Sequence, residues 1–166
     1  MGNTKFTSTT YGDWKSIVNK LEGLDKKVDE AMNVALAQTT LKGEKIAVKH
    51  IVNQDLKWRK LNKAYKKRKI ALGKSEKTLI SSSTYLQSIT SFVAGGYGFV
   101  GVKRGVYAKS EEGKEPIEVA NIALIMEYGS EKANIKPRRL WKPTLLELKS
   151  WIRDSGIFVK EIKKKL

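Results

Sequence analysis

The feature that most constrains the fold is a run of apolar residues at helical spacing between Asp25 and Gln54. Val28 and Met32 begin this stripe, and it continues through Ala35, Leu36, Thr39, Ile46 and Ile51. Asp25 is a suitable N-cap for the helix. At 1.5 Å per residue such a helix is roughly 40 Å long. The pattern therefore predicts a long backbone against which neighbouring subunits can pack side by side.

A shorter helix is expected before it, from Trp14 to about Glu22. Asp13 is placed to cap this helix, whose apolar face consists of Trp14, Ile17, Val18 and Leu21. Gly23 is predicted to interrupt the chain between the two helices, and Gly43 weakens the longer one. Residues 1–12 are polar and are expected to form a flexible arm, which leaves residues 13–166 as a single domain.

The composition excludes several classes of protein. The 166 residues are 40% hydrophobic and 30% charged, which is typical of a globular chain with one core. No apolar run approaches the roughly 20 residues of a membrane-spanning helix, and no signal peptide is expected at the N-terminus. The sequence contains no cysteine, which excludes disulfides, cysteine nucleophiles and thiolate zinc sites. Packing or partners must therefore hold the fold together.

Positive charge is concentrated in one stretch of the chain. The formal net charge is +16, and Lys57 to Lys77 holds ten lysines and arginines against a single acid, Glu76. Such a field attracts polyanions, although it also suits a solvated surface or an acidic protein partner. A second basic cluster ends the chain at Lys160, Lys163, Lys164 and Lys165. The candidate DNA-facing residues are Lys57, Arg59, Lys60, Lys63, Lys66, Lys67, Arg68 and Lys69.

Aromatic residues are interleaved with these cations. Trp58 and Tyr65 stand among the lysines, a pattern that can bind single-stranded nucleic acid by stacking. The preferred interpretation is instead that Trp58 and Leu61 pack into the core while the lysines face water. A stand-alone basic nucleic-acid-binding protein remains the alternative function, and it predicts binding that weakens steeply with salt.

A β-hairpin is predicted after the basic stretch. Leu86 to Val93 is expected to form a strand, Gly95-Gly96 a tight turn, and Tyr97 to Ala108 the returning strand. The glycines lack the Lys-Ser/Thr of a phosphate-binding P-loop, so the turn is preferred. The charged segment that follows is a candidate subunit-contact loop through Lys109, Glu111, Glu112, Lys114 and Glu115.

The C-terminal part is predicted to be mainly helical. Glu118–Glu127 is expected to form a helix, with a buried strand as the alternative, and Gly129 is its expected C-cap. A final amphipathic helix starts near Pro143 and ends at Gly156. The chain is then expected to finish as a short tail over Ile157–Ile162.

Few residues are candidates for catalysis. His50 is the only histidine, and no carboxylate or serine stands at a suggestive spacing from it, so it is interpreted as an ordinary helix residue. Acids never occur at the spacing of a metal-binding loop. Glu127 follows an apolar run and is expected to pair with Arg138 or Arg139 and so stabilise the fold. The sequence therefore predicts a protein that is not an enzyme and uses no cofactor or metal.

Four short motifs follow one another between Leu56 and Glu147. They are Trp58-Arg59-Lys60-Leu61 before the lysine-rich run, Leu79-Ile80 with Thr84-Tyr85-Leu86-Gln87-Ser88-Ile89, Glu127-Tyr128-Gly129-Ser130, and Lys136-Pro137-Arg138-Arg139-Leu140-Trp141. In this order the chain resembles the tail-completion, or virion-morphogenesis, proteins of tailed bacteriophages. It departs from the family pattern at Tyr85, where glycine is usual, and at Arg138 and Leu140, where a small residue and a proline are usual.

The resemblance implies an α+β domain with a long N-terminal helix, a central antiparallel sheet with a projecting hairpin, a helix packed on the sheet and a C-terminal amphipathic segment. It also implies a structural protein of the virion, made in the bacterial host cytoplasm, that forms a homo-oligomeric ring at the neck or the head-proximal end of the tail. The implied partners are head-connector and tail-tube or tail-terminator proteins, with genomic DNA in the channel and no membrane. Residues expected to stabilise the fold are Trp58, Glu127, Gly129, Arg138, Arg139 and Trp141.

Overall fold

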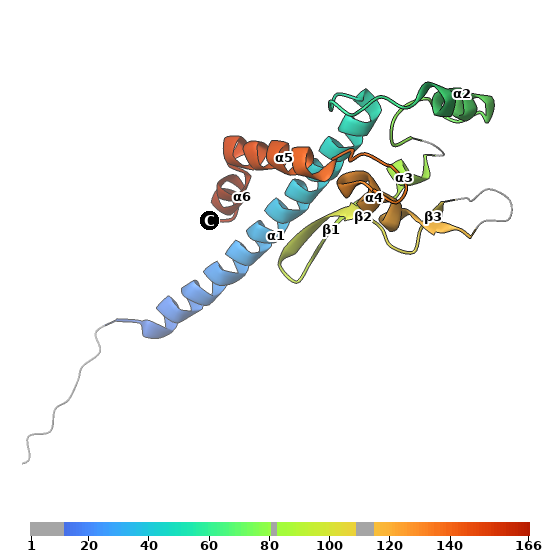
Figure 1. Cartoon of the computed structure of the whole chain (residues 1–166). Coiled ribbons are helices and arrows are strands. Elements are labelled where there is room, and N and C mark those ends of the chain that lie inside the picture. The colour runs from blue at the N-terminus through green and yellow to red at the C-terminus, as the bar shows by residue number, and fades with distance from the viewer. Residues whose placement is uncertain (1–11, 81–82, 109–114) are drawn as a thin grey trace, which may run out of the picture.

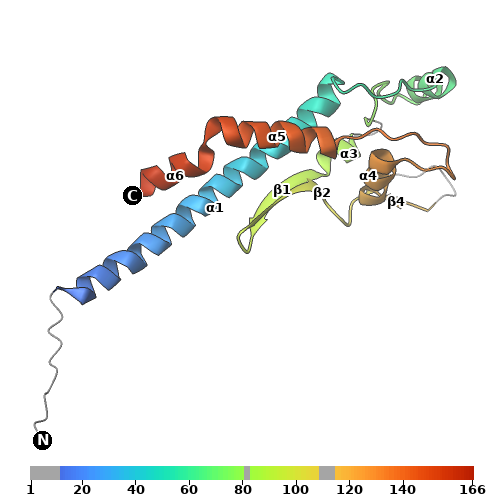
Figure 2. The same ribbon diagram turned by 60° about the vertical axis from the view of Figure 1, so that its left-hand side comes forward.

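A computed structural model describes residues 12–80, 83–108 and 115–166 (Figure 1). The expected N-terminal arm, apart from Gly12, and most of the expected contact loop lie outside these ranges. The fold is α+β, as predicted. A long helix, α1 (Trp14–Asn53), runs through the molecule, with a β-hairpin on one side and two C-terminal helices on the other (Figures 1 and 2).

The helix α1 is continuous, so the predicted interruption at Gly23 is wrong. The side chain of Asp13 caps it as expected, accepting the backbone N–H of Ser16 at 3.1 Å. A glycine in a helix costs only about 1 kcal/mol relative to alanine, which the flanking turns offset. The helix ends where Gln54 adopts a left-handed conformation.

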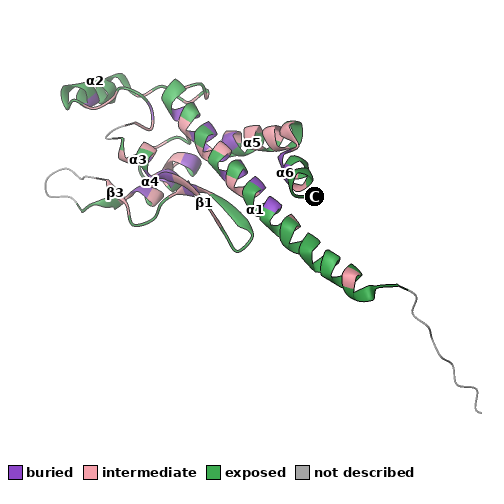
Figure 3. Ribbon diagram, turned by 180° about the vertical axis from the view of Figure 1, so that it is seen from behind, coloured by how far each residue is buried: buried purple, intermediate pink, exposed green. Residues whose placement is uncertain are grey.

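The two halves of α1 differ in burial (Figure 3). From Ala31 onward one face is buried, including Ala35, Ile46, Ala47 and Ile51. Before Ala31 almost every side chain is exposed or half-exposed, although several of them are apolar. We call residues 14–30 the α1 extension, because the figures show it running beyond the elements that cover the rest of the helix (Figure 2).

The hairpin consists of β1 (Ile89–Ala94) and β2 (Tyr97–Val102), joined at Gly95-Gly96 as predicted. It packs on α1 through small residues. A Cβ built on Gly98 would lie 2.5 Å from Cγ2 of Thr40, and one on Gly43 would lie 3.1 Å from Val100. These glycines therefore set how closely the hairpin and α1 approach each other.

Both hairpin strands are shorter than predicted. Leu86 belongs instead to a short helix, α3 (Thr84–Gln87), and β2 ends at Val102. The residues beyond Arg104 turn through Gly105, which has a positive φ, into β3 (Tyr107–Ala108). This strand pairs with β4 (Ile117–Glu118) in a second two-stranded antiparallel sheet.

The helix predicted after β4 is confirmed as α4 (Val119–Tyr128), with Gly129 as its C-cap at φ 84°. The amphipathic helix is also confirmed, as α5 (Trp141–Ser155), ending at Gly156. The predicted tail is wrong, because the chain continues as a further helix, α6 (Ile157–Lys165). Gly156 at φ 57° closes α5 and opens α6 in a single residue.

The hydrophobic core joins elements that are far apart in the sequence. Ala47 and Ile51 of α1 meet Tyr85, Ile89, Val119, Ala123 and Leu140. Trp58 and Trp141 pack against this cluster, which agrees with their expected role in stabilising the fold. Within the described residues, no helix has the length and apolar character required to cross a bilayer.

Candidate assembly and polyanion-binding surfaces

The basic stretch folds around a helix that the sequence analysis missed, α2 (Lys63–Ala71). Asn62 caps it, its side chain accepting the backbone N–H of Ala64 at 2.9 Å. The helix lies beyond the C-terminal end of α1 (Figure 1). Seven of the eight candidate DNA-facing residues are exposed there or just before it, namely Lys57, Arg59, Lys60, Lys63, Lys66, Lys67 and Arg68.

Lys69 is the exception, and its assignment as a DNA-facing residue is corrected. Its side chain is buried, and Nζ donates hydrogen bonds to the carbonyl oxygens of Lys77 at 2.9 Å and Ile80 at 2.8 Å. Burial, with a smaller contribution from the positive charges of Lys74 and Arg138, lowers the pKa of the Lys69 ammonium. Lys69 therefore fastens the segment after α2 and does not face solvent.

The exposed face of α2 combines charge with apolar surface. Lys66 forms an ion pair with Glu76 at 2.8 Å, which partly neutralises the positive charge of Lys66. Tyr65, Ile70 and Leu72 are each about half exposed. This surface suits polyanions, because cations are presented beside side chains that can pack on a base or an apolar group.

Trp58 does not belong to that exposed surface. Its indole Nε1 donates to the carbonyl oxygen of Arg139 at 2.9 Å, and the ring packs against the core. This agrees with the interpretation of Trp58 as a core residue, and Leu61 is half-buried. The basic stretch is thereby tied to the segment that precedes α5.

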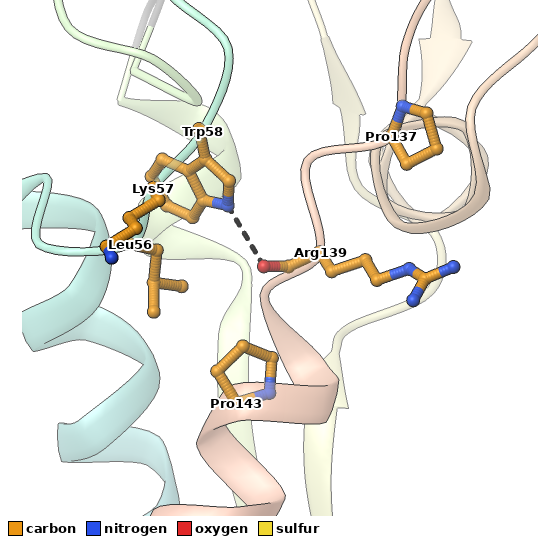
Figure 4. A pocket seen from close by; sticks show the side chains of 6 residues that line it. All are labelled: Leu56, Lys57, Trp58, Pro137, Arg139 and Pro143. Carbon is orange, nitrogen blue, oxygen red and sulfur yellow. Dashed lines mark hydrogen bonds between the residues drawn. The ribbon is translucent and has the colours of Figure 1, made fainter.

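A hollow of about 460 Å³ lies beside this hydrogen bond (Figure 4). Its wall is mainly apolar, and the guanidinium of Arg139 extends away from Trp58 (Figure 4). The six lining residues are Leu56, Lys57, Trp58, Pro137, Arg139 and Pro143. Leucine, tryptophan and the two prolines give the hollow an apolar wall against which another side chain can pack, and the lysine and arginine add positive charge.

Glu127 stabilises the fold through different partners from those expected. Its carboxylate accepts backbone N–H groups from Leu140 at 2.7 Å, Trp141 at 3.0 Å and Lys142 at 3.4 Å. It therefore caps the N-terminus of α5, whose own N-cap residue supplies no side-chain bond. In the described part of the chain, neither Arg138 nor Arg139 forms an ion pair with Glu127, so the predicted pairing is wrong.

The residues around Glu127 form a buried polar centre. Burial, and then the negative charge of Glu127, raises the pKa of Tyr85 far above that of an exposed tyrosine. The guanidinium of Arg138 reaches toward the sulfur of Met126, with Nη1 at 3.9 Å. Gly129 must remain small, because a Cβ there would lie 2.8 Å from the carbonyl oxygen of Ile135.

His50 is more than the ordinary helix residue that was predicted. It is buried in α1, and Nδ1 lies 2.7 Å from the carboxylate of Asp55. Nε2 lies 3.4 Å from Glu147 of α5, within ion-pair distance but without hydrogen-bond geometry. Asp55 stands only five residues along the chain, which was the available signal; Glu147 meets His50 only through the packing of α5 on α1. The trio links two helices.

The outer face of the hairpin is aromatic. Phe92 and Phe99 stack with ring centroids 4.9 Å apart, and Tyr97 is 81% exposed. Because side chains alternate along a strand, these residues lie opposite the face that carries Gly98 and Val100 toward α1. Exposed apolar groups gathered in this way are typical of a protein–protein contact surface.

The predicted contact loop is represented here by Glu115 alone, which is exposed. Lys109, Glu111, Glu112 and Lys114 lie outside the described residues. No model of a protein family matches the chain, and neither a curated protein nor a solved structure is significantly similar to it.

Proposed function

We propose that this chain is a non-enzymatic structural protein of a bacteriophage virion. In this proposal copies of it form a ring at the neck or the head-proximal end of the tail, where the ring completes the tail or joins it to the head. The observation that carries the assembly role is that one subunit exposes two separate apolar surfaces, the α1 extension and the aromatic face of the hairpin.

A ring requires each subunit to have two different contact surfaces. Each subunit of a closed ring meets its two neighbours through different surfaces, so a single exposed apolar surface cannot close the ring. The α1 extension and the hairpin are different elements, and the extension runs on past the tip of the hairpin (Figure 2). The ordered motifs from Trp58 to Trp141 supply the reason for choosing a phage neck or tail rather than another ring-shaped assembly.

The test is deletion of this reading frame from the phage genome that carries it. The lysate is then examined by negative-stain electron microscopy. We expect DNA-filled heads separate from tails, or tails of faulty length, and recovery when the gene is supplied in trans. Intact infectious particles from the deletion would refute the proposal.

A second candidate function is supported by α2. Seven exposed cations around one short helix suit direct contact with nucleic acid, either in the channel of a ring or in a stand-alone binding protein. The informative variant neutralises Lys63, Lys66 and Lys67 and leaves the buried Lys69 intact. If the stand-alone function is correct, affinity for short duplex or single strands falls in this variant and the salt dependence becomes shallower. Unchanged binding would exclude α2 as the contact.

A further inference from the structure

Five of the six apolar residues of the α1 extension are spaced alternately three and four residues apart, and the sixth, Val18, lies beside them at position e of the heptad. The spacing of these five is the a and d pattern of a coiled coil. At 100° per residue the five side chains fall within about 80° of arc. The seam consists of Trp14, Ile17, Leu21, Leu24 and Val28.

Inside the molecule the same seam continues and is covered. Its next two positions, Ala31 and Ala35, are buried where α6 lies along α1. The helix α6 ends beside Glu30, whose carboxylate accepts a hydrogen bond from Lys165 at 2.8 Å. Val28 is half-buried, and from Leu24 to Trp14 the seam residues are exposed in the described part of the chain, with Leu21 at 60%.

The α1 extension therefore lacks the packing that normally stabilises a helix. Isolated helices of roughly 17 residues are marginal in water, and Gly23 weakens this one further. A second helix laid along the seam would bury the apolar side chains and supply the missing stability.

We propose that the α1 extension pairs with the same stretch of a second copy of this chain as a parallel coiled coil. In a parallel pair, a residue at position g faces the e residue five positions later on the partner helix. Lys20 occupies g and Asp25 the following e, so opposite charges meet, and symmetry repeats the pair. An antiparallel pair would bring g positions together and set Lys20 against a lysine, Lys20 or Lys27. Charge complementarity thus favours two parallel copies.

This inference rests on the proposed function in that copies of the chain assemble with one another. It adds the residues of one contact and its direction. Because the contact joins like stretches, it forms two-fold pairs, so a ring that contains it is built from pairs of subunits that meet one another through other surfaces. The paired extensions would lie on the side of the assembly away from α2, because the extension and α2 lie toward opposite ends of α1 (Figure 1).

The absence of cysteine from the chain allows a direct test. Leu24→Cys places a thiol at position d, where identical residues face each other in a parallel pair. Lys26→Cys places one at position f, on the outer side, as a matched control. Both residues are exposed in the single subunit, so both variants are expected to keep the wild-type circular dichroism spectrum and melting temperature. On mild oxidation, Leu24→Cys is expected to form disulfide-linked dimers about tenfold faster, because only seam thiols come within bonding distance.

Equally slow cross-linking of the two variants would overturn the pairing. In an equal mixture of Leu21→Cys and Leu24→Cys, random pairing gives twice as much mixed dimer as either homodimer, and a mixed dimer in excess of that ratio would overturn the parallel direction. If Leu24→Cys fails to cross-link while the deletion still separates heads from tails, the seam is refuted and the virion function stands. If the deletion leaves intact infectious particles and the Leu24→Cys cross-link forms, the virion function is refuted and the coiled coil stands.

Discussion

The carboxylate of Glu127 accepts the backbone N–H of Leu140 across 2.7 Å, which joins the end of α4 to the start of α5. The same carboxylate accepts the next two backbone N–H groups. One buried acid thus caps a helix whose N-cap residue, Leu140, lies thirteen residues further along the chain.

Removing this cap is expected to destabilise the fold strongly. Glu127→Ala leaves the N–H groups of Leu140 and Trp141 without their acceptor, and a loss of about 2–4 kcal/mol in the free energy of unfolding is expected. Glu127→Gln retains one oxygen acceptor and is expected to cost less, about 1–2 kcal/mol. Urea unfolding measures both. Glu131→Gln, which changes an exposed acid, is the control and is expected to be neutral. Equal stability of Glu127→Ala and wild type would contradict the capping role.

Lys69 and Lys67 are expected to separate stability from polyanion binding. Lys69→Met leaves the carbonyl oxygens of Lys77 and Ile80 without their donor and is expected to cost about 1–3 kcal/mol. It is expected to leave DNA affinity unchanged. Lys67→Met is expected to leave the melting temperature unchanged and, if α2 contacts DNA, to make the salt dependence of binding shallower by about one phosphate contact. The reverse pattern would show that Lys69 faces the ligand after all.

The pH dependence of stability gives a separate check on Lys69. Its pKa is lowered in the folded state, so in the range just below the ordinary lysine value of 10.5 the unfolded chain binds more protons at this site. The contribution of this group to stability therefore rises with pH through that range. The difference in unfolding free energy between wild type and Lys69→Met is expected to widen from pH 8 toward pH 10.5. A difference that narrows would contradict a lowered pKa.

Gly98 is expected to tolerate no side chain. Gly98→Ala drives a methyl group to 2.5 Å from Cγ2 of Thr40, and the resulting overpacking is expected to cost about 1–3 kcal/mol. Thr40→Ser removes the opposing methyl group while keeping the hydroxyl that donates to the carbonyl oxygen of Ala37. The double variant is therefore expected to recover much of the loss in a double-mutant cycle. Purely additive effects would mean that the two groups do not meet.

Gly23 offers the opposite case. A Cβ at this position would meet no described atom within 4 Å, so Gly23→Ala changes only helix propensity. An increase of up to about 1 kcal/mol in local helix stability is expected, visible as slower amide exchange across the α1 extension. The global melting temperature is expected to change little, because the extension contributes little to the core. Unchanged exchange would indicate that the extension is already held by another contact.

What the sequence could predict depended on whether a signal was local. The cap at Asp13, the turn at Gly95-Gly96 and the helix ends at Gly129 and Gly156 follow from residues whose conformational preferences act over a few positions, and all four were predicted. Local signals also misled. Gly23 was predicted to break the helix. The destabilisation that a glycine causes in a helix, about 1 kcal/mol relative to alanine, is small beside the stability of the helical turns on either side.

The missed elements lacked a readable pattern or depended on distant partners. Five of the nine residues of α2 are lysine or arginine, and its buried residue is a lysine, so the helix offers no apolar stripe. The hydrogen bond from Leu140 to Glu127 and the close approach of His50 to Glu147 connect helices that meet only in the folded chain. A nearby arginine seemed the natural partner of Glu127, but backbone groups, which sequence patterns do not reveal, took that place.

Because α1 is continuous, a tilt of its packed part also moves its free end. The helix is packed against other elements from Ala31 onward, and Trp14 lies about 25 Å beyond that point at 1.5 Å per residue. Simple geometry then amplifies small motions, since a tilt of about 5° of the packed part moves the tip by about 2 Å over this length. Packing changes at Gly43, where the hairpin and α5 both touch α1, are thus magnified at the far end of the helix.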